Sequence, residues 1–300
     1  MLNRIGSRWE MDIEERMKLD QLDRITDEAI EGAIYRTKLK AWKRAGIDHV
    51  SPSHLETAST SFAKWYMSYI KKIKTDTNPA MERGKQVEHA IFLNIMGVVK
   101  DVDECVRIAK KRFSDELMLG SSKLASIAKE AANLEPMIKS GIEFLKPYGI
   151  PKLQYVEKAG EFIQPSIDHK LDQLAVNCIG NMDAFYEPDM KIVDVKTSAK
   201  SVNGLLRSWR RQGALYASAN PGYSMEFVVI TPKGVASIKQ TEQEIKDGLN
   251  EATLIAQTVQ RWLLLKEQPH QLAEIIIPDF SSFKMQDPEY QDAGHEIWGF

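Results

Sequence analysis

The sequence predicts a mixed α/β or α+β fold: a central mixed β-sheet flanked by helices, with a helical N-terminal extension. Residues up to about 146 carry apolar side chains mainly at helical spacing, and the proline-bounded segment 147–151 ends that region. After it, β-rich segments alternate with helical ones. Of the residues, 43% are hydrophobic and 27% are charged, as in an ordinary globular domain. This order of elements packs helices against a sheet.

The first half is expected to be largely helical, with a break over 71–79. Residues 11–45 carry isoleucine, leucine and methionine at loose helical spacing, which favours a solvated helical arm or a packing layer. Ser51 and Pro52 mark a helix start, with the serine as N-cap and the proline in the first turn. Apolar residues then follow at helical steps to Tyr69. Further helices are expected over 79–96 and on to about residue 146.

The second half supplies the sheet. Strands are expected over 154–161, 174–186, 191–197, 226–231 and 234–239, with a turn at 187–189. Helices are expected over 203–219 and 242–266. The chain therefore divides into a helical extension (1–49), one folded core domain (50–275) and an acidic tail (276–300). The tail ends in aromatic residues, which could dock on a partner protein. We favour the alternative that the tail is a disordered end or a strap packed on the body.

Composition excludes several classes of protein. The net charge of -2 excludes a globally basic nucleic-acid binder but leaves room for a local basic groove. Two cysteines, Cys105 and Cys178, exclude a disulfide scaffold, a four-thiolate zinc site and a cysteine-ligated iron–sulfur cluster, and they favour a reducing cytoplasm. The N-terminus becomes charged too early for a signal peptide. No apolar run reaches the roughly 18 residues of a membrane helix.

Common catalytic motifs are absent from the sequence. It contains no G-x-x-x-x-G-K phosphate loop, so we expect no ATP-driven motor. It also lacks a G-x-G-x-x-G dinucleotide motif, an H-E-x-x-H zinc motif and a G-x-S-x-G nucleophile elbow.

One group of residues carries a chemical signal. If Pro188 and Asp189 form a two-residue hairpin loop, counting back along both strands places Asp183 opposite Asp194. Two carboxylates at that separation repel each other unless a cation lies between them, and a hard divalent ion such as Mg²⁺ or Mn²⁺ fits oxygen ligands. A loop one residue longer would shift this register.

Lys196 shares a strand face with Asp194, because side chains alternate along a strand. A lysine beside a metal can orient the attacking water or neutralise charge on a phosphate. The D-x-K pattern by itself has little specificity, and without further context an exposed salt bridge on an edge strand is the favoured explanation.

Four further motifs occur in a fixed order along the chain. They are V-S-P-S-H-L at 50–55, R-G-K-Q-V-E-H at 83–89, G-N-M-D at 180–183 followed by D-V-K-T at 194–197, and Q-G-A-L-Y at 212–216. Together they resemble the PD-(D/E)xK nuclease superfamily, and within it the RecB-like, exodeoxyribonuclease VIII-like and lambda exonuclease-like phage-type enzymes. The resemblance covers about residues 50–216 and implies a restriction-endonuclease-like core.

The resemblance implies roles for individual residues. Glu88, Asp183 and Asp194 would bind the metal together with the Val195 carbonyl, and Lys196 would position the attacking water. The implied cofactor is Mg²⁺ or Mn²⁺, as two ions, with no iron–sulfur cluster and no ATP.

His89 is the alternative to Glu88, since exodeoxyribonuclease VIII-like members carry a histidine at the place that Glu88 holds. Neighbouring helix residues point about 100° apart, so both cannot face the metal equally. We favour Glu88, and a packing role for His89 is equally open.

Basic residues offer candidate DNA contacts. Gln212 and Tyr216 lie on one helix face and would contact DNA phosphates, brace the lysine, or simply pack on the sheet. The candidate phosphate tracks are the Arg207, Arg210, Arg211 cluster and the Lys71, Lys72, Lys74 cluster beside Trp65 and Tyr66. A solvated helix face and amphipathic packing are the respective alternatives.

The expected function is therefore metal-dependent, ATP-independent exonuclease action on double-stranded DNA ends, serving recombination or repair by strand annealing. The expected setting is a bacterial or phage-infected cytoplasm, and the expected partners are a single-strand annealing or single-strand-binding protein and a homo-oligomeric ring. The alternatives are a structure- or site-specific endonuclease and a catalytically silent module that binds DNA or a partner.

Overall fold

The computed structural model describes residues 13–118 and 124–299, and it confirms the predicted mixed sheet flanked by helices. The central sheet has the order β6-β7-β8-β9, with β7 and β8 parallel and the other pairs antiparallel. The strands are β6 (Ala184–Tyr186), β7 (Lys191–Thr197), β8 (Ser224–Thr231) and β9 (Gly234–Lys239).

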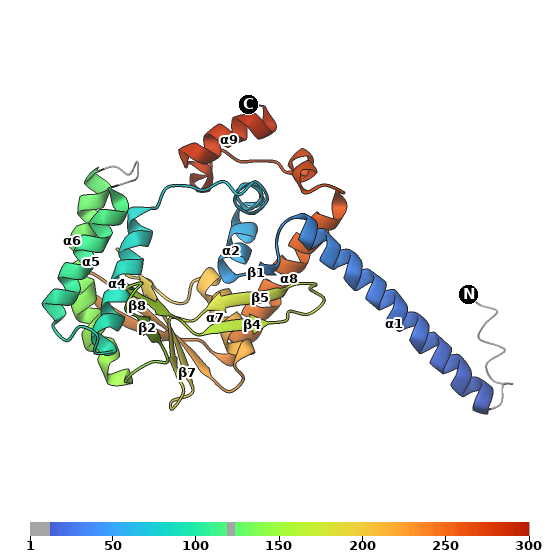
Figure 1. Ribbon diagram of the computed structural model, residues 1–300, viewed down its shortest axis with the longest axis horizontal. Helices are drawn as coiled ribbons and strands as arrows, with labels where there is room; N and C mark the ends of the chain where they lie inside the picture. The colour runs from blue at the N-terminus through green and yellow to red at the C-terminus, as the bar shows by residue number, and fades with distance from the viewer. Residues whose placement is uncertain (1–12, 119–123, 300) are drawn as a thin grey trace.

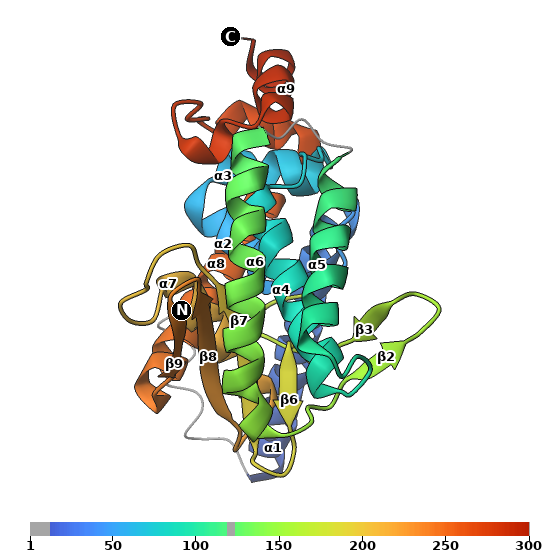
Figure 2. The same ribbon diagram turned by 90° about the vertical axis from the view of Figure 1, so that its left-hand side faces the viewer.

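Helices cover both faces of this sheet. On one face lie α4 (Pro79–Ile95), α5 (Val102–Leu117) and α6 (Leu124–Leu145), seen in front of the strands in Figure 2. On the other face lie α7 (Arg207–Ala219) and α8 (Glu242–Leu265). Along β7, Val193 and Val195 pack toward α4–α6, whereas Ile192 packs toward α7 and α8. The alternation therefore places Asp194 and Lys196 on one face of β7, as predicted, and this face is the α7 side.

The β6–β7 hairpin has the predicted register. The amide of Met190 donates to the Glu187 carbonyl at 3.2 Å, which closes a tight turn over 187–190. Ala184 pairs with Val193 and Tyr186 with Lys191. Asp183 immediately precedes β6, so continuing the same register by one residue brings it opposite Asp194.

Two predicted strands are interrupted in the structure. The expected strand 174–186 is divided into β5 (Asn177–Asn181) and β6, because β5 pairs with β1 and β4 whereas β6 pairs with β7 in the central sheet. The Met182 amide still donates to the Pro165 carbonyl at 2.8 Å, on the β4 side of the break. The expected strand 154–161 is a hairpin of β2 (Gln154–Val156) and β3 (Glu161–Ile163). Its turn ends at Gly160, whose positive φ of 65° suits glycine.

A second, three-stranded sheet has the order β1-β5-β4. It contains β1 (His49–Val50), parallel to β5, and β4 (Ser166–His169), antiparallel to β5. Because β1 pairs with β5, it delivers the following helix α2 (Pro52–Thr60) next to the strand that leads to Asp183.

The predicted helix start at Ser51 is confirmed, and the continuous helix after it is not. The Ser51 side chain accepts from the His54 amide at 3.2 Å, with Pro52 in the first turn. Ser61 then ends α2 and caps α3 (Phe62–Trp65) by accepting from the Lys64 amide at 3.2 Å. A π-helical turn (Tyr66–Ile70) follows.

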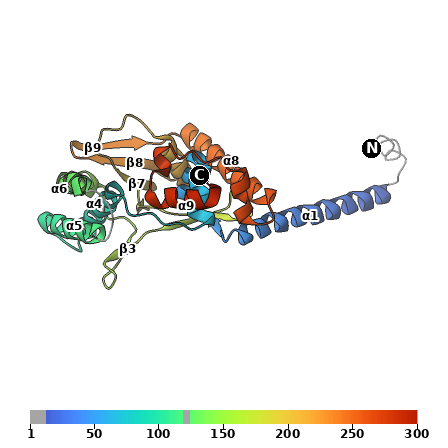
Figure 3. The same ribbon diagram turned by 90° about the horizontal axis from the view of Figure 1, so that it is seen from above.

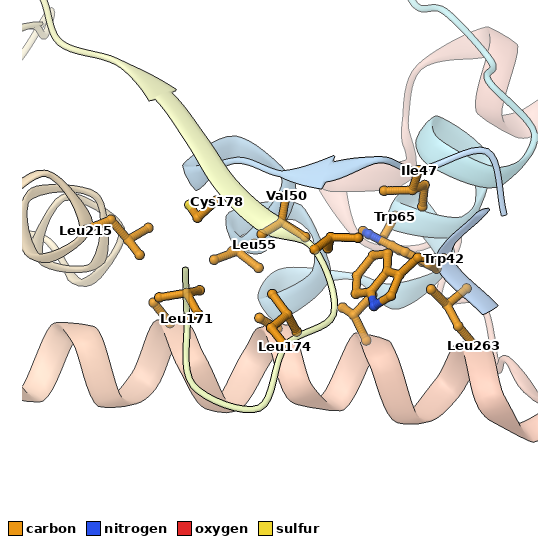
Figure 4. Close-up of a cluster of buried hydrophobic side chains, with 14 of the residues drawn as sticks. Trp42, Ile47, Val50, Leu55, Trp65, Leu171, Leu174, Cys178, Leu215 and Leu263 are labelled. Atoms are coloured by element: carbon orange, nitrogen blue, oxygen red, sulfur yellow. The ribbon is translucent and has the colours of Figure 1, made fainter. Parts of the chain in front are cut away.

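The main core lies between the second sheet, α2 and the α7–α8 layer (Figure 4). Ten buried side chains labelled there come from segments far apart in the sequence: Trp42, Ile47, Val50, Leu55, Trp65, Leu171, Leu174, Cys178, Leu215 and Leu263. Their burial fixes α2 and α7 against the strands that carry the acidic residues.

The long helix α1 (Ile13–Arg44) projects from the body (Figures 1 and 3). Its C-terminal part is embedded, where the buried Trp42 ring donates to the Gln260 side chain at 3.1 Å. It thus combines an arm with a packing layer, and the expected helical residues 11 and 12 lie outside the described residues.

The tail folds as a strap on the body. It follows the 3₁₀ turn Pro269–Ile275, contains a second 3₁₀ turn, Phe283–Met285, and includes α9 (Pro288–Trp298). Another 3₁₀ turn, Lys146–Tyr148, follows α6. The hydroxyls of Tyr290 and Ser68 lie 2.8 Å apart, and the Trp298 indole donates to the Ala273 carbonyl at 3.0 Å. The terminal aromatic side chain at 298 is therefore used within the fold.

Across residues 13–118 and 124–299, every helix is too short or too polar to cross a lipid bilayer.

Candidate active site

Asp194 and Lys196 form a close ion pair on the α7 side of β7. The Lys196 ammonium nitrogen lies 2.5 Å from Asp194 Oδ1. Asp194 is fully buried, while the lysine side chain remains 22% exposed. The pair is therefore no solvated edge-strand salt bridge, because β7 is an interior strand between β6 and β8.

Gln212 and Tyr216 on α7 hold this pair in place. Lys196 donates to Gln212 Oε1 at 2.9 Å, and Gln212 Nε2 donates to Asp194 Oδ2 at 2.8 Å. The same amide donates to the Tyr216 hydroxyl at 3.0 Å, which in turn donates to the Asn181 carbonyl at 2.6 Å. Of the roles considered for these two residues, the contacts match bracing of the lysine.

Asp183 reaches the site through the interruption between β5 and β6. Its Oδ2 accepts from the Val195 backbone amide at 2.8 Å, which orients the carboxylate across the hairpin from the Asp194–Lys196 pair. A carboxylate at this position replaces the ladder bond that a continuous strand would make.

Glu88 enters from α4 and meets Asp183 through a residue that the sequence analysis missed. Gln164, directly after β3, donates from Nε2 to Glu88 Oε1 at 2.8 Å and to Asp183 Oδ1 at 3.3 Å. A lone glutamine in a connecting segment gives no signal in the sequence, because its role depends on which elements converge around it.

His89 points to a different partner from Glu88. Its Nε2 lies 2.8 Å from the Gly160 carbonyl in the β2–β3 turn, and its ring packs 5.5 Å from that of Phe162. Glu88 thus joins the carboxylate cluster, whereas His89 contacts the β2–β3 hairpin. This is expected for adjacent helix residues, which point about 100° apart.

Burial and mutual repulsion perturb the acidic residues. Burial, with a contribution from Asp194, raises the pKa of Asp183 to about 7. Burial and the nearby Asp183 and Asp194 raise the pKa of Glu88 well above its usual range, and burial raises the pKa of Asp194. Burial tends to lower the pKa of Lys196, but the surrounding carboxylates outweigh it and raise that pKa overall. The cluster therefore favours additional positive charge.

The donor set fits a hard divalent ion. Asp194 Oδ1 is buried, and its contact is the ion pair with the Lys196 ammonium, 2.5 Å away. Within the described residues, no group of three His, Cys, Asp or Glu side chains is arranged so that it could hold a metal ion. Mg²⁺ commonly binds through one or two carboxylates and keeps several waters, so a partial set of oxygen ligands suits it.

A pocket of about 730 Å³ opens onto these residues. It is bounded by α4, the β2–β3 hairpin and β7, and its lining includes Glu88, Gln164, Asp183 and Lys196. Asp194 lies beneath the floor of this pocket rather than on its surface.

A buried ion pair supports one wall of this pocket. Arg83 pairs with Glu130 of α6 and donates to the Thr197 hydroxyl at 3.2 Å, next to Lys196 in the chain. Gly84 permits this approach, because a Cβ there would lie 2.9 Å from Thr197 Oγ1. The wall thereby ties α4 to the end of β7.

The predicted arginine track is largely engaged within the protein. Arg211 is 7% exposed and pairs with Glu56 and with Glu251, the latter at 2.7 Å. Arg210 also pairs with Glu251, at 3.1 Å. Arg207 contacts the same glutamate at 2.5 Å but is 74% exposed, so it has the greatest freedom to meet a phosphate.

The predicted lysine track keeps its charges but lacks its aromatic platform. Lys71 and Lys72 are exposed at the end of the π-helical turn. Trp65 and Tyr66 are buried, and Trp65 stacks on His54 with ring centroids 5.7 Å apart. These aromatics pack the core, as the alternative interpretation held, so the lysines could only provide charge.

Comparison with known proteins identifies the family. A family model described as the PD-(D/E)XK nuclease superfamily matches residues 49–276, which is most of the chain and includes every acidic residue of the site. No curated protein matches the chain. Nucleases of this superfamily typically use divalent ions such as Mg²⁺. The chain belongs to the PD-(D/E)XK nuclease superfamily.

Proposed function

We propose that this metal-dependent nuclease is an ATP-independent exonuclease that degrades DNA from double-stranded ends. The observation that carries the proposal is the Gln212 amide, which binds both Lys196 and Asp194. It belongs to the Q-x-x-x-Y motif that resembles the RecB-like exonuclease branch. These contacts support a role for that motif beside the reacting groups.

In this proposal some residues of the site bind the metal ions and Lys196 positions the attacking water. Glu88, Asp183 and Asp194, with the Val195 carbonyl, would hold two Mg²⁺ or Mn²⁺ ions. Bound ions of this kind lower the pKa of the attacking water and stabilise charge on the scissile phosphate. Lys196 lines the pocket with its ammonium group fixed by Asp194 and Gln212. It can therefore orient a water or a phosphate oxygen without rearranging.

The dimensions of the pocket favour DNA ends over duplex interiors. A volume of about 730 Å³ falls in the range of small-ligand sites and suits a short piece of one strand. We infer that one strand leaves its partner to reach this pocket, and unpairing costs a few kcal/mol per nucleotide inside a duplex. A terminal nucleotide has only one stacked neighbour, so this cost is smallest at an end.

In this proposal the product strands serve recombination or repair by strand annealing in a bacterial or phage-infected cytoplasm. A single-strand annealing or single-strand-binding protein would take up those strands. A ring of several copies around the duplex would provide processivity.

The test compares DNA with and without ends. Purified protein is incubated with end-labelled linear duplex and with supercoiled plasmid, each with Mg²⁺ or EDTA and without ATP. We expect Mg²⁺-dependent release of label from the linear DNA and intact closed circles. Linearisation of the plasmid would instead identify an endonuclease, and binding of DNA without cleavage of either substrate would identify a silent module.

A further inference from the structure

Gln164 occupies the position between two carboxylates that belong to different layers of the fold. Glu88 projects from α4, and Asp183 lies at the interruption between β5 and β6. One amide nitrogen, Gln164 Nε2, donates to both, at 2.8 Å and 3.3 Å. An amide group has two hydrogens on that nitrogen, so it can satisfy both acceptors at once.

The backbone around Gln164 is fixed on both sides. On one side, the Gly160 carbonyl accepts from His89 at 2.8 Å and from Arg112 at 3.0 Å, which ties the β2–β3 hairpin to α4 and α5. On the other side, the Pro165 carbonyl accepts from the Met182 amide at 2.8 Å. These contacts on both sides of Gln164 fix the position from which its side chain reaches Glu88 and Asp183.

We propose that Gln164 is a positioning residue that holds Glu88 and Asp183 at the separation needed to bind a divalent cation together. The inference rests on the proposed use of both carboxylates as ligands. Buried carboxylates repel each other, and in the absence of a fixed donor they would turn apart or take up a proton. A neutral amide donates hydrogen bonds to both without adding a competing charge.

His89 contributes to the same arrangement through the hairpin. Neighbouring residues of α4 contact the two ends of one segment: His89 contacts Gly160, and Glu88 contacts Gln164. Because Gly160 and Gln164 enclose β3, the helix and the hairpin are fixed relative to each other by two adjacent side chains.

The experiment measures cation binding by the full-length protein without DNA. Mn²⁺ is titrated calorimetrically into the wild type, into Gln164→Met, which keeps the length and removes the donor, and into Gln154→Met. Gln154 is an exposed glutamine on the same hairpin and serves as the matched control. Outer partners of metal ligands typically contribute 10- to 100-fold to affinity, so we expect Gln164→Met to bind Mn²⁺ at least about 10-fold more weakly and the control to match the wild type.

A second variant separates positioning from general stabilisation. Gln164→Glu keeps the shape but places a third negative charge between Glu88 and Asp183. We expect it to lower the melting temperature in EDTA, and we expect saturating Mn²⁺ to raise that temperature by more than in the wild type. A residue that only stabilised the fold would lower the melting temperature equally with and without Mn²⁺.

Three outcomes would overturn the inference: unchanged Mn²⁺ affinity in Gln164→Met, an equal loss in the Gln154→Met control, or no Mn²⁺ binding by the wild type. DNA cleavage plays no part in these measurements. A wild type whose Mn²⁺ affinity depends on Gln164 but which digests neither linear nor circular DNA would refute the proposed function and leave this inference standing.

Discussion

Lys196 and Gln212 lie on different elements, β7 and α7, and the lysine ammonium donates to the glutamine Oε1 at 2.9 Å. The same amide donates to Asp194. The Gln212 amide therefore hydrogen-bonds to both members of the ion pair, with its oxygen toward Lys196 and its nitrogen toward Asp194. The flipped amide could make neither bond. The active-site lysine is held by a hydrogen-bonded network rather than by the ion pair alone.

This network predicts a catalytic loss on removal of the amide. In Gln212→Leu the lysine loses one of its two partners, and we expect a 10- to 100-fold lower rate of linear DNA digestion, the range found for residues that orient reacting groups. Gln243→Leu on α8, where the side chain bonds only to the exposed Asp247, is the matched control. Equal rates for wild type and Gln212→Leu would contradict the bracing role.

Asp194→Asn tests the assignment of the buried carboxylate. Since the asparagine keeps the shape but loses the charge, we expect the Mg²⁺-dependent cleavage of linear duplex to fall to background. Far-ultraviolet circular dichroism should report a retained fold. The control Asp189→Asn changes an exposed carboxylate at the hairpin turn and should keep full activity. Undiminished cleavage by Asp194→Asn would remove the residue from the site.

The raised pKa of Asp183 predicts a pH-dependent stability in EDTA. Its pKa is about 7 in the folded protein against an ordinary value of 3.8, so between these values the folded state binds more protons than the unfolded state. Stability should therefore fall as pH rises through this window, by at most about 1.4 kcal/mol per pH unit for one proton. Thermal unfolding of the wild type and of Asp183→Asn at pH 4.0 to 8.0, spanning this window, measures the difference.

The variant should lack this component and should be relatively more stable near neutral pH. Mn²⁺ must displace the proton, so its affinity for the wild type should increase as pH rises toward 8. Parallel stability curves for the two proteins would show that Asp183 does not titrate abnormally.

Position 180 next to Tyr216 has no room for a side chain larger than that of glycine. A Cβ at this position would lie 2.9 Å from Tyr216 Cε1 and 3.3 Å from Pro52 Cδ. Gly180→Ala should lower the free energy of unfolding by about 1–3 kcal/mol, as overpacking typically does, and should reduce cleavage by displacing the tyrosine.

Gly32→Ala on the projecting part of α1 is the control for this substitution. Its nearest neighbour would be the flexible Arg36 side chain at 3.4 Å, and alanine is favoured over glycine in a helix by about 1 kcal/mol. Urea denaturation of both variants checks the contrast; equal stability of wild type and Gly180→Ala would mean that the close packing is absent in solution.

Arg207 and Arg211 should respond differently to substitution. Arg211→Ala removes a buried guanidinium from Glu56, which is partly exposed, and from Glu251, which keeps Arg207 and Arg210, so we expect a loss of about 1–3 kcal/mol in stability. Arg207→Ala should leave stability nearly unchanged and weaken DNA binding, with the salt dependence of log K reduced by about 1 if the residue meets one phosphate. Unchanged DNA affinity in Arg207→Ala would exclude it from a phosphate track.

The sequence by itself determined the features that depend on neighbours along the chain. Ser51 and Pro52 specify a helix start through the orphan backbone amides of the first turn. The Glu187–Met190 turn fixes the hairpin register, and the two-residue period of a strand then places Asp194 and Lys196 on one face, near Asp183. These patterns also yielded the strands 191–197 and 234–239 with the bounds seen in the structure.

Only the tertiary structure decided the contacts between distant segments. Gln164 and Glu88 are 76 residues apart, and Arg211 and Glu56 are 155 residues apart. Neither pair follows a local period, because each depends on how helices pack across the sheet. Helix packing likewise decided whether Glu88 or His89 faces the site. It also decided whether an arginine of α7 is buried or exposed to solvent.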